Sequence, residues 1–112
     1  MKRVPILLAA LALAGQALAA DPAKGKQIAE KGAGGPPCAA CHGLDGAKPV
    51  APENPILAGQ HQDYIVRALM DYKSGKRANP VMKSIADTLK RSDMEDVAAW
   101  FSSQKSNLHF QR

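Results

Sequence analysis

The chain has 112 residues, with 15 Lys and Arg against 10 Asp and Glu, and only two cysteines. This length suffices for one small domain, which excludes a multidomain enzyme. The net charge is +5, and the basic residues are scattered singly or in pairs such as Lys76-Arg77 and Lys90-Arg91. Proteins that track phosphates usually cluster Lys and Arg along one face, so we expect no nucleic-acid partner.

The start of the chain has the pattern of a secretory signal peptide. Two basic residues precede an apolar run from Val4 to Ala14, and Ala17-Leu18-Ala19 is the small-x-small pattern of a cleavage site. The apolar run is shorter than the roughly 20 residues that cross a bilayer, so a retained anchor is the weaker interpretation. We expect residues 1–19 to be a cleaved leader and residues 20–112 to form an exported domain.

Two helices are predicted on either side of a long central segment. The first runs from Pro22 to Lys31, with Asp21 as its N-cap and Gly32 as its stop. The second covers 61–74, where apolar and aromatic residues recur on one face, and Gly75 ends it.

The segments between and after these helices contain strong helix breakers. Residues 32–60 hold five prolines and six glycines, which indicates turns with at most a short helical piece around the cysteines. Asn79-Pro80 is expected to begin a second loop. Ser92-Asp93-Met94-Glu95 has the pattern of a capping box and predicts a last helix from Ser92 to about Gln104. No stretch alternates like a strand, so the sequence predicts an all-α fold of three main helices joined by long loops.

The central segment carries Cys38-Ala39-Ala40-Cys41-His42, the C-x-x-C-H arrangement of covalent haem c attachment. Two thiols about one helical turn apart can reach the two vinyl groups of one porphyrin. The next residue then presents its imidazole to the iron from the same side. The motif predicts one covalent haem c, with Cys38 and Cys41 as thioethers and His42 as an axial iron ligand.

Two other interpretations of the cysteines are weaker. A disulfide or a thioredoxin-like redox pair is compatible with export, but a thioredoxin-like domain needs a sheet that this sequence does not predict. A tetrahedral zinc site is weaker still, because His61 and His109 are isolated and do not form a closely spaced pair.

The candidates for the second axial position are Met70, Met82, Met94, His61 and His109, and Met82 is the favoured one. It follows Asn79-Pro80-Val81 in a predicted loop, forty residues beyond His42, so the chain can pass the haem edge and approach the iron from the far side. Met70 and Met94 fall on or beside apolar helix faces, where methionine commonly fills the core. A loop methionine has no such face to explain it.

Together these residues resemble a class I c-type cytochrome, and within that class one half of the di-haem periplasmic cytochromes of the cytochrome c-four group and related mono-haem carriers. The resemblance implies that the first and last helices cross near the haem, with Gly25 facing Trp100 or Phe101. Because the C-x-x-C-H motif occurs once, only a single haem can attach. The similarity covers nearly all of the expected mature chain and rests on these segments: Cys38 to Gly43, Leu57-Ala58-Gly59-Gln60, Lys73-Ser74-Gly75, Asn79 to Met82, Ser92-Asp93-Met94 and Phe101 to Gln104.

The resemblance also implies contacts around the ligands. A carbonyl from a proline loop should orient His42, with Pro52 as the best match and Pro49 as the alternative. Arg77 resembles a position that can meet a haem propionate.

The ligand pair and the resemblance imply a soluble periplasmic electron carrier rather than an enzyme. An iron bound by both His42 and Met82 has no open position for a substrate, which leaves one-electron outer-sphere transfer in a respiratory chain. Expected partners are redox proteins, such as a membrane electron-transfer complex and a terminal oxidase or reductase, met through transient contacts. The alternatives are a dedicated haem subunit of a periplasmic dehydrogenase and, if Met82 does not bind, a haem enzyme or sensor. Monomer and dimer are both compatible with the sequence.

Overall fold

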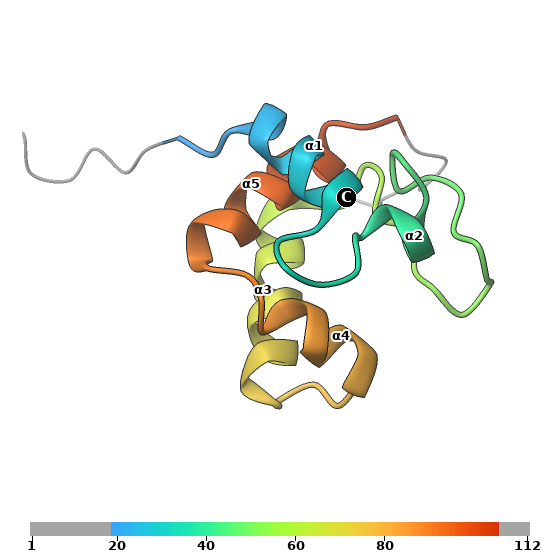
Figure 1. Cartoon of the computed structure of the whole chain (residues 1–112). Helices are drawn as coiled ribbons and strands as arrows, with labels where there is room; N and C mark the ends of the chain where they lie inside the picture. The colour runs from blue at the N-terminus through green and yellow to red at the C-terminus, as the bar shows by residue number, and fades with distance from the viewer. Residues whose placement is uncertain (1–18, 106–112) are drawn as a thin grey trace, which may run out of the picture.

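The computed structural model describes residues 19–105, and its regular structure is entirely helical (Figure 1). No strand occurs among these residues, which confirms the all-α prediction, and none of their helices is long and apolar enough to cross a membrane. Residues 1–18 of the expected leader and His109 lie outside the described residues. The helices, in chain order, are α1 (Pro22–Lys31), α2 (Ala39–His42), α3 (Gln62–Ser74), α4 (Pro80–Ala86) and α5 (Arg91–Ser102).

The ends of α1 and α3 follow the sequence signals. The Asp21 carboxylate accepts the amide of Ala23 at 2.9 Å and so caps α1. Gly32 and Gly75 follow the two helices with φ angles of 76° and 85°, which a residue with a Cβ rarely adopts. Both predicted helices are confirmed.

Helix α4 corrects the prediction that Asn79-Pro80 opens a loop. The Asn79 side-chain oxygen accepts the amides of Val81 and Met82, each at 3.1 Å, and therefore caps a new helix. Pro80 occupies the first helical position, where its missing N–H costs nothing. The Asn-Pro pair stops one helix and starts the next.

The start of α5 also differs from the prediction. The N-cap residue is Lys90, and its backbone amide donates to the Asp93 carboxylate at 2.9 Å rather than to that of Glu95. Glu95 instead pairs with Arg91 at 3.1 Å, one turn away on the same helix. The helix begins at Arg91 because the capping pair lies two residues before the predicted one.

Helices α1 and α5 pack against each other (Figure 1), and their close approach depends on Gly25. Gly25 is buried, and a Cβ built on it would overlap the carbonyl oxygen of Asp96. The glycine therefore faces the backbone of α5, whereas the resemblance implied that it faces an aromatic ring. Trp100 lies beside Lys26, with the ammonium 5.6 Å from the ring centroid.

Phe101 connects this crossing to the central segment. Its side chain is 1% exposed, and a Cβ added to Gly46 would come within 2.8 Å of its ring. The Phe101 carbonyl accepts the amide of Gly59 at 2.9 Å. The long segment between α2 and α3 is thus packed on α5 at two places, which fixes its position relative to the core.

Replacement of Gly25 by alanine tests the crossing. Helix propensity alone predicts a gain in stability, since alanine is favoured over glycine by about 1 kcal/mol in a helix interior. The overlap with Asp96 predicts the opposite sign, a loss of about 1–3 kcal/mol, because α1 must move off α5. Denaturant unfolding of the wild-type and Gly25→Ala proteins gives the sign, and an unchanged or increased stability contradicts the close approach.

Candidate haem site

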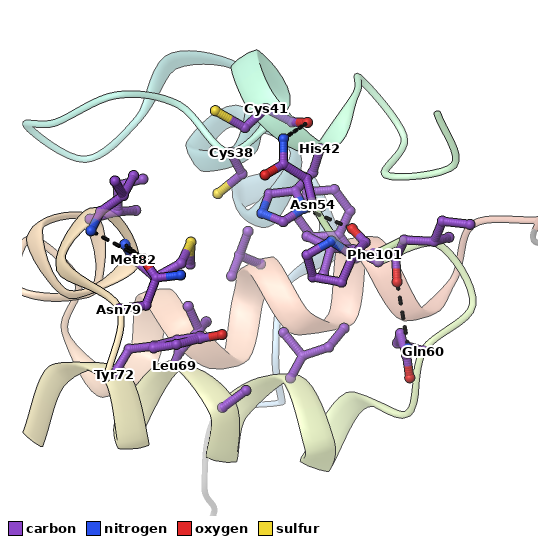
Figure 2. Close-up of a pocket in the computed structure, with 18 of the residues that line it drawn as sticks. Cys38, Cys41, His42, Asn54, Gln60, Leu69, Tyr72, Asn79, Met82 and Phe101 are labelled. Carbon is purple, nitrogen blue, oxygen red and sulfur yellow. Dashed lines mark hydrogen bonds between the residues drawn. The ribbon is translucent and has the colours of Figure 1, made fainter. Parts of the chain in front are cut away.

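A cavity of about 370 Å³ lies between α2 with its following segment and the helices α3 and α4. Figure 2 shows Cys38, Cys41 and His42 on one side of this space, and Leu69, Tyr72 and Met82 on the other. The structure therefore brings all four predicted site residues to one cavity. Its apolar lining comes mainly from Pro37, Pro55, Ile56, Leu57, Ile65, Ala68, Leu69, Val81, Ile85, Val97 and Phe101.

The two cysteines stand one turn apart on α2. Cys38 is the N-cap residue and Cys41 lies in the helix, and both thiols are free and half-buried. Burial raises the pKa of the Cys38 thiol to about 11, so this thiol stays protonated at neutral pH. Both sulfur atoms are available for a covalent bond to a group in the cavity.

His42 ends α2 and is held in one orientation. Its side chain is buried, and Nδ1 donates to the carbonyl oxygen of Pro55 at 2.9 Å. Because a carbonyl can only accept, Nδ1 carries the hydrogen and Nε2 of the neutral ring keeps its lone pair. The orienting carbonyl comes from Pro55, so the assignments to Pro52 and Pro49 are both wrong.

Asn54 explains why Pro55 is the residue that reaches the histidine. The Asn54 side-chain amide donates to the Cys41 carbonyl at 3.1 Å, and the Val50 amide donates to the same oxygen at 3.0 Å. These two bonds hold the segment after α2 against the end of that helix, and Figure 2 shows Asn54 beside Cys41 and His42. They place the Pro55 carbonyl next to the imidazole. Asn54 was not among the predicted site residues; the Asn-Pro pair at 54–55 is the signal that could have found it, because such pairs favour turns.

Met82 lies in the first turn of α4, on the opposite side of the cavity from His42 (Figure 2). Its side chain is half-buried and packs against the hydrophobic core. The Asn79 cap fixes the amide of Met82 itself. The thioether is thus presented to the cavity by a short helix rather than by the predicted loop.

The other candidates for the second axial position lie elsewhere. Met70 is 41% exposed, and its sulfur accepts from the Arg91 guanidinium at 3.0 Å. Met94 is 2% exposed and belongs to the core. His61 is the N-cap residue of α3 and is not part of the cavity lining.

Arg77 lines the cavity near the junction of α3 and α4. Its guanidinium stacks on the Tyr72 ring, 4.7 Å from the centroid, and its backbone amide donates to Asp71. The stacking holds a cation at the cavity edge. A contact of Arg77 with a haem propionate stays a prediction.

The chemistry of these donors fits a covalently attached haem. Two thiols, an imidazole with a free Nε2 and a thioether surround one apolar cavity. The sheet of a thioredoxin-like domain is missing from residues 19–105, which are helical or irregular. Within the same residues, no group of three or more His, Cys, Asp and Glu side chains is arranged to hold a metal ion.

Comparison with known proteins gives a family match and several cytochrome relatives. Residues 22–105 match the sequence model of the cytochrome c family. Cytochrome c4 of Pseudomonas aeruginosa is 42% identical over 103 residues, which cover 91% of this chain and 48% of that protein. The thiosulfate dehydrogenase electron acceptor of Stutzerimonas stutzeri is 42% identical over 95 residues, covering 82% of this chain and 43% of that protein.

Solved structures agree with the sequence relatives. The structure of Acidithiobacillus ferrooxidans cytochrome c4 superposes with a TM-score of 0.70 at 38% identity, over 75% of this chain and 49% of that one. The chain spans about half the length of the curated relatives it matches, in keeping with its single C-x-x-C-H motif. The family match over most of the chain, the shared helical fold and the one haem-attachment motif lead to one conclusion: the chain belongs to the cytochrome c family and carries one covalently bound haem c.

Proposed function

We propose that the protein is a one-electron carrier in which His42 and Met82 are the two axial ligands and Cys38 and Cys41 are the thioether attachments. The observation that carries this proposal is the placement of an imidazole and a thioether on opposite sides of one apolar cavity. A haem held there supplies one-electron chemistry, because its iron changes between the ferric and ferrous states. The relatives reported above are named as cytochromes or as an electron acceptor, which supports the proposal.

The two side-chain ligands favour electron transfer over catalysis. When Nε2 of His42 and the sulfur of Met82 both bind, the chain itself occupies the two axial positions. A substrate then has no place to bind without displacing a protein ligand. The lining of the cavity is mostly apolar, so a haem bound there would be partly shielded from water.

The nature of the ligands sets the direction of the reduction potential. A thioether donates weakly and favours the ferrous form, which raises the potential relative to two imidazole ligands. The buried side chains around the cavity act in the same direction. The hydrogen bond from His42 to the Pro55 carbonyl acts oppositely, because it makes Nε2 a stronger donor. We expect a relatively high potential that this bond moderates.

The proposed setting is the periplasm, within a respiratory chain. Its partners would be a membrane electron-transfer complex and a terminal oxidase or reductase, and their contacts would be brief. Two apolar side chains suit such contacts: Val81 at the cavity is 62% exposed, and Leu44, two residues after His42, is 71% exposed. A specific alternative is a dedicated electron acceptor of one dehydrogenase, which is favoured by the relative named as the acceptor of a thiosulfate dehydrogenase.

Replacing Met82 by alanine tests the axial ligand. The ferric wild-type protein should show the weak long-wavelength band of sulfur-to-iron charge transfer, and Met82→Ala should lose it and bind carbon monoxide readily when reduced. The matched control is Met70→Ala, which removes a thioether that lies outside the cavity and should keep the band. A wild-type protein without the band, or a band lost from Met70→Ala instead, would sink the proposed ligand set.

Replacing Asn54 by alanine tests the support of His42. Without the amide that holds the segment to Cys41, the Pro55 carbonyl should bond the imidazole less well and the potential should rise. If the ferric form loses about 0.5–1 kcal/mol more stabilisation than the ferrous form, the potential of this one-electron couple rises by about 20–40 mV. Spectroelectrochemical titration measures the shift, with Gln60→Ala as the control because Gln60 lines the cavity but bonds neither α2 nor Pro55. A lowered potential, or equal shifts in both variants, would argue against the proposed support.

Export and maturation have a direct test of their own. We propose that the leader is cleaved after Ala19, which leaves Ala20 as the first residue of the exported protein. The intact mass of protein purified from the periplasm should then equal residues 20–112 plus one haem. A mass that retains the leader rules out the cleaved form.

A further inference from the structure

The helix that carries Met82 is weakly anchored by apolar contacts. Helix α4 has seven residues, of which only Ile85 and Ala86 are buried, and both lie in its last turn. Among the helices of the described chain, α4 packs against α3 alone. In its first turn Met82 is half-buried against the core and no residue is fully buried, so polar contacts can add substantially to the hold on this turn.

Lys83, the residue after Met82, supplies one such contact. Its ammonium donates to the main-chain carbonyl of Lys73 at 3.0 Å and pairs with the Asp87 carboxylate at 3.2 Å. The Lys73 carbonyl belongs to the last turn of α3, where carbonyl groups lack helical partners and a cation is favoured. Lys83 thus fastens the first half of α4 to the end of α3.

Lys73 supplies the second contact, which lies beyond the C-terminal end of α4. Its ammonium donates to the carbonyl of Leu89 at 2.6 Å. Leu89 is 2% exposed and lies in the connection between α4 and α5. Lys73 therefore accepts a hydrogen bond from Lys83 of α4 through its carbonyl, and its ammonium donates one to the segment that follows α4.

We propose that Lys73 and Lys83 are positioning residues that hold Met82 against the cavity. If the first turn of α4 swings away about the apolar contacts at Ile85 and Ala86, the Lys83 bond to α3 must break. The Lys73 bond to Leu89 lies beyond that hinge and holds the hinge itself against α3. The two lysines therefore slow the departure of the Met82 sulfur without touching it. This inference rests on the proposed ligation by Met82.

The experiment measures how fast the sulfur leaves. Ferric protein is mixed with increasing imidazole, and the loss of the sulfur-to-iron band is followed; the limiting rate at saturating imidazole is the rate of methionine departure. We expect Lys83→Leu and Lys73→Leu to raise this rate by about threefold or more, since each loses a charged hydrogen bond that is partly exposed to water, and leucine adds no new iron ligand. Lys83→Arg keeps the cation and should return the rate toward the wild-type value.

Two controls separate positioning from other effects. Lys24→Leu removes the same charge from an exposed position of α1 and should leave the rate unchanged. Gly25→Ala is expected to lower global stability at the α1–α5 crossing without touching either lysine bond, so its rate shows how much of any acceleration comes from lower stability alone. Circular dichroism confirms that each variant is folded, and if one lysine variant does not fold, the other decides.

The outcomes are distinct. Faster departure in the lysine variants alone supports the inference. Equal rates in all proteins, or equal acceleration by Lys24→Leu or Gly25→Ala, overturn it while Met82 remains the ligand. A wild-type protein that lacks the band overturns the ligand proposal instead.

Discussion

The hydrogen bond between His42 Nδ1 and the Pro55 carbonyl is the contact on which the rest of the site depends. It fixes the tautomer of the imidazole and the direction of Nε2, and it joins α2 to a segment that has no regular structure of its own. The bonds of Asn54 and Val50 to the Cys41 carbonyl serve the same junction. A peptide of five residues can carry two thiols and an imidazole, but this junction gives those groups a fixed direction.

The cavity exists because two separately anchored parts of the chain face each other across it. The part that contains α2 rests on α5 through the contacts of Phe101 with Gly46 and Gly59. In the other part, two lysine ammonium groups donate to main-chain carbonyls and so join α4 and the connection after it to α3. Helix α5 supports both parts, and its close approach to α1 at Gly25 fixes its place in the core. The cavity between these parts is lined mostly by apolar side chains, which a bound haem would cover. The haem would thereby add the large apolar body that a domain of this size needs for stability.

The parts of the fold that sequence predicts are those whose signals are local. Asp21-Pro22, Gly32 and Gly75 act within one turn of their helices, and the C-x-x-C-H motif fits within a single turn and its flanks. The parts that sequence missed depend on distance in space. Three prolines at 49, 52 and 55 are equally spaced along the segment, and the bonds of Asn54 and Val50 to the Cys41 carbonyl select the last of them. Asn79-Pro80 can end a helix or begin one, and the choice depends on whether α3 offers a surface for Ile85 and Ala86. Gly25 was predicted at the right crossing, but a pattern of residue types cannot tell a neighbouring ring from a neighbouring backbone.

The proton NMR spectrum of the reduced protein tests the central claim most directly. A methionine methyl group held over the face of the haem lies in the ring current of the macrocycle, which shifts its resonance far upfield of every other methyl. Ligation by Met82 opposite His42 predicts one such three-proton resonance in the wild-type protein, which disappears in Met82→Ala and remains in Met70→Ala. A spectrum without an upfield methyl, or one in which that resonance survives the loss of Met82, would contradict the account.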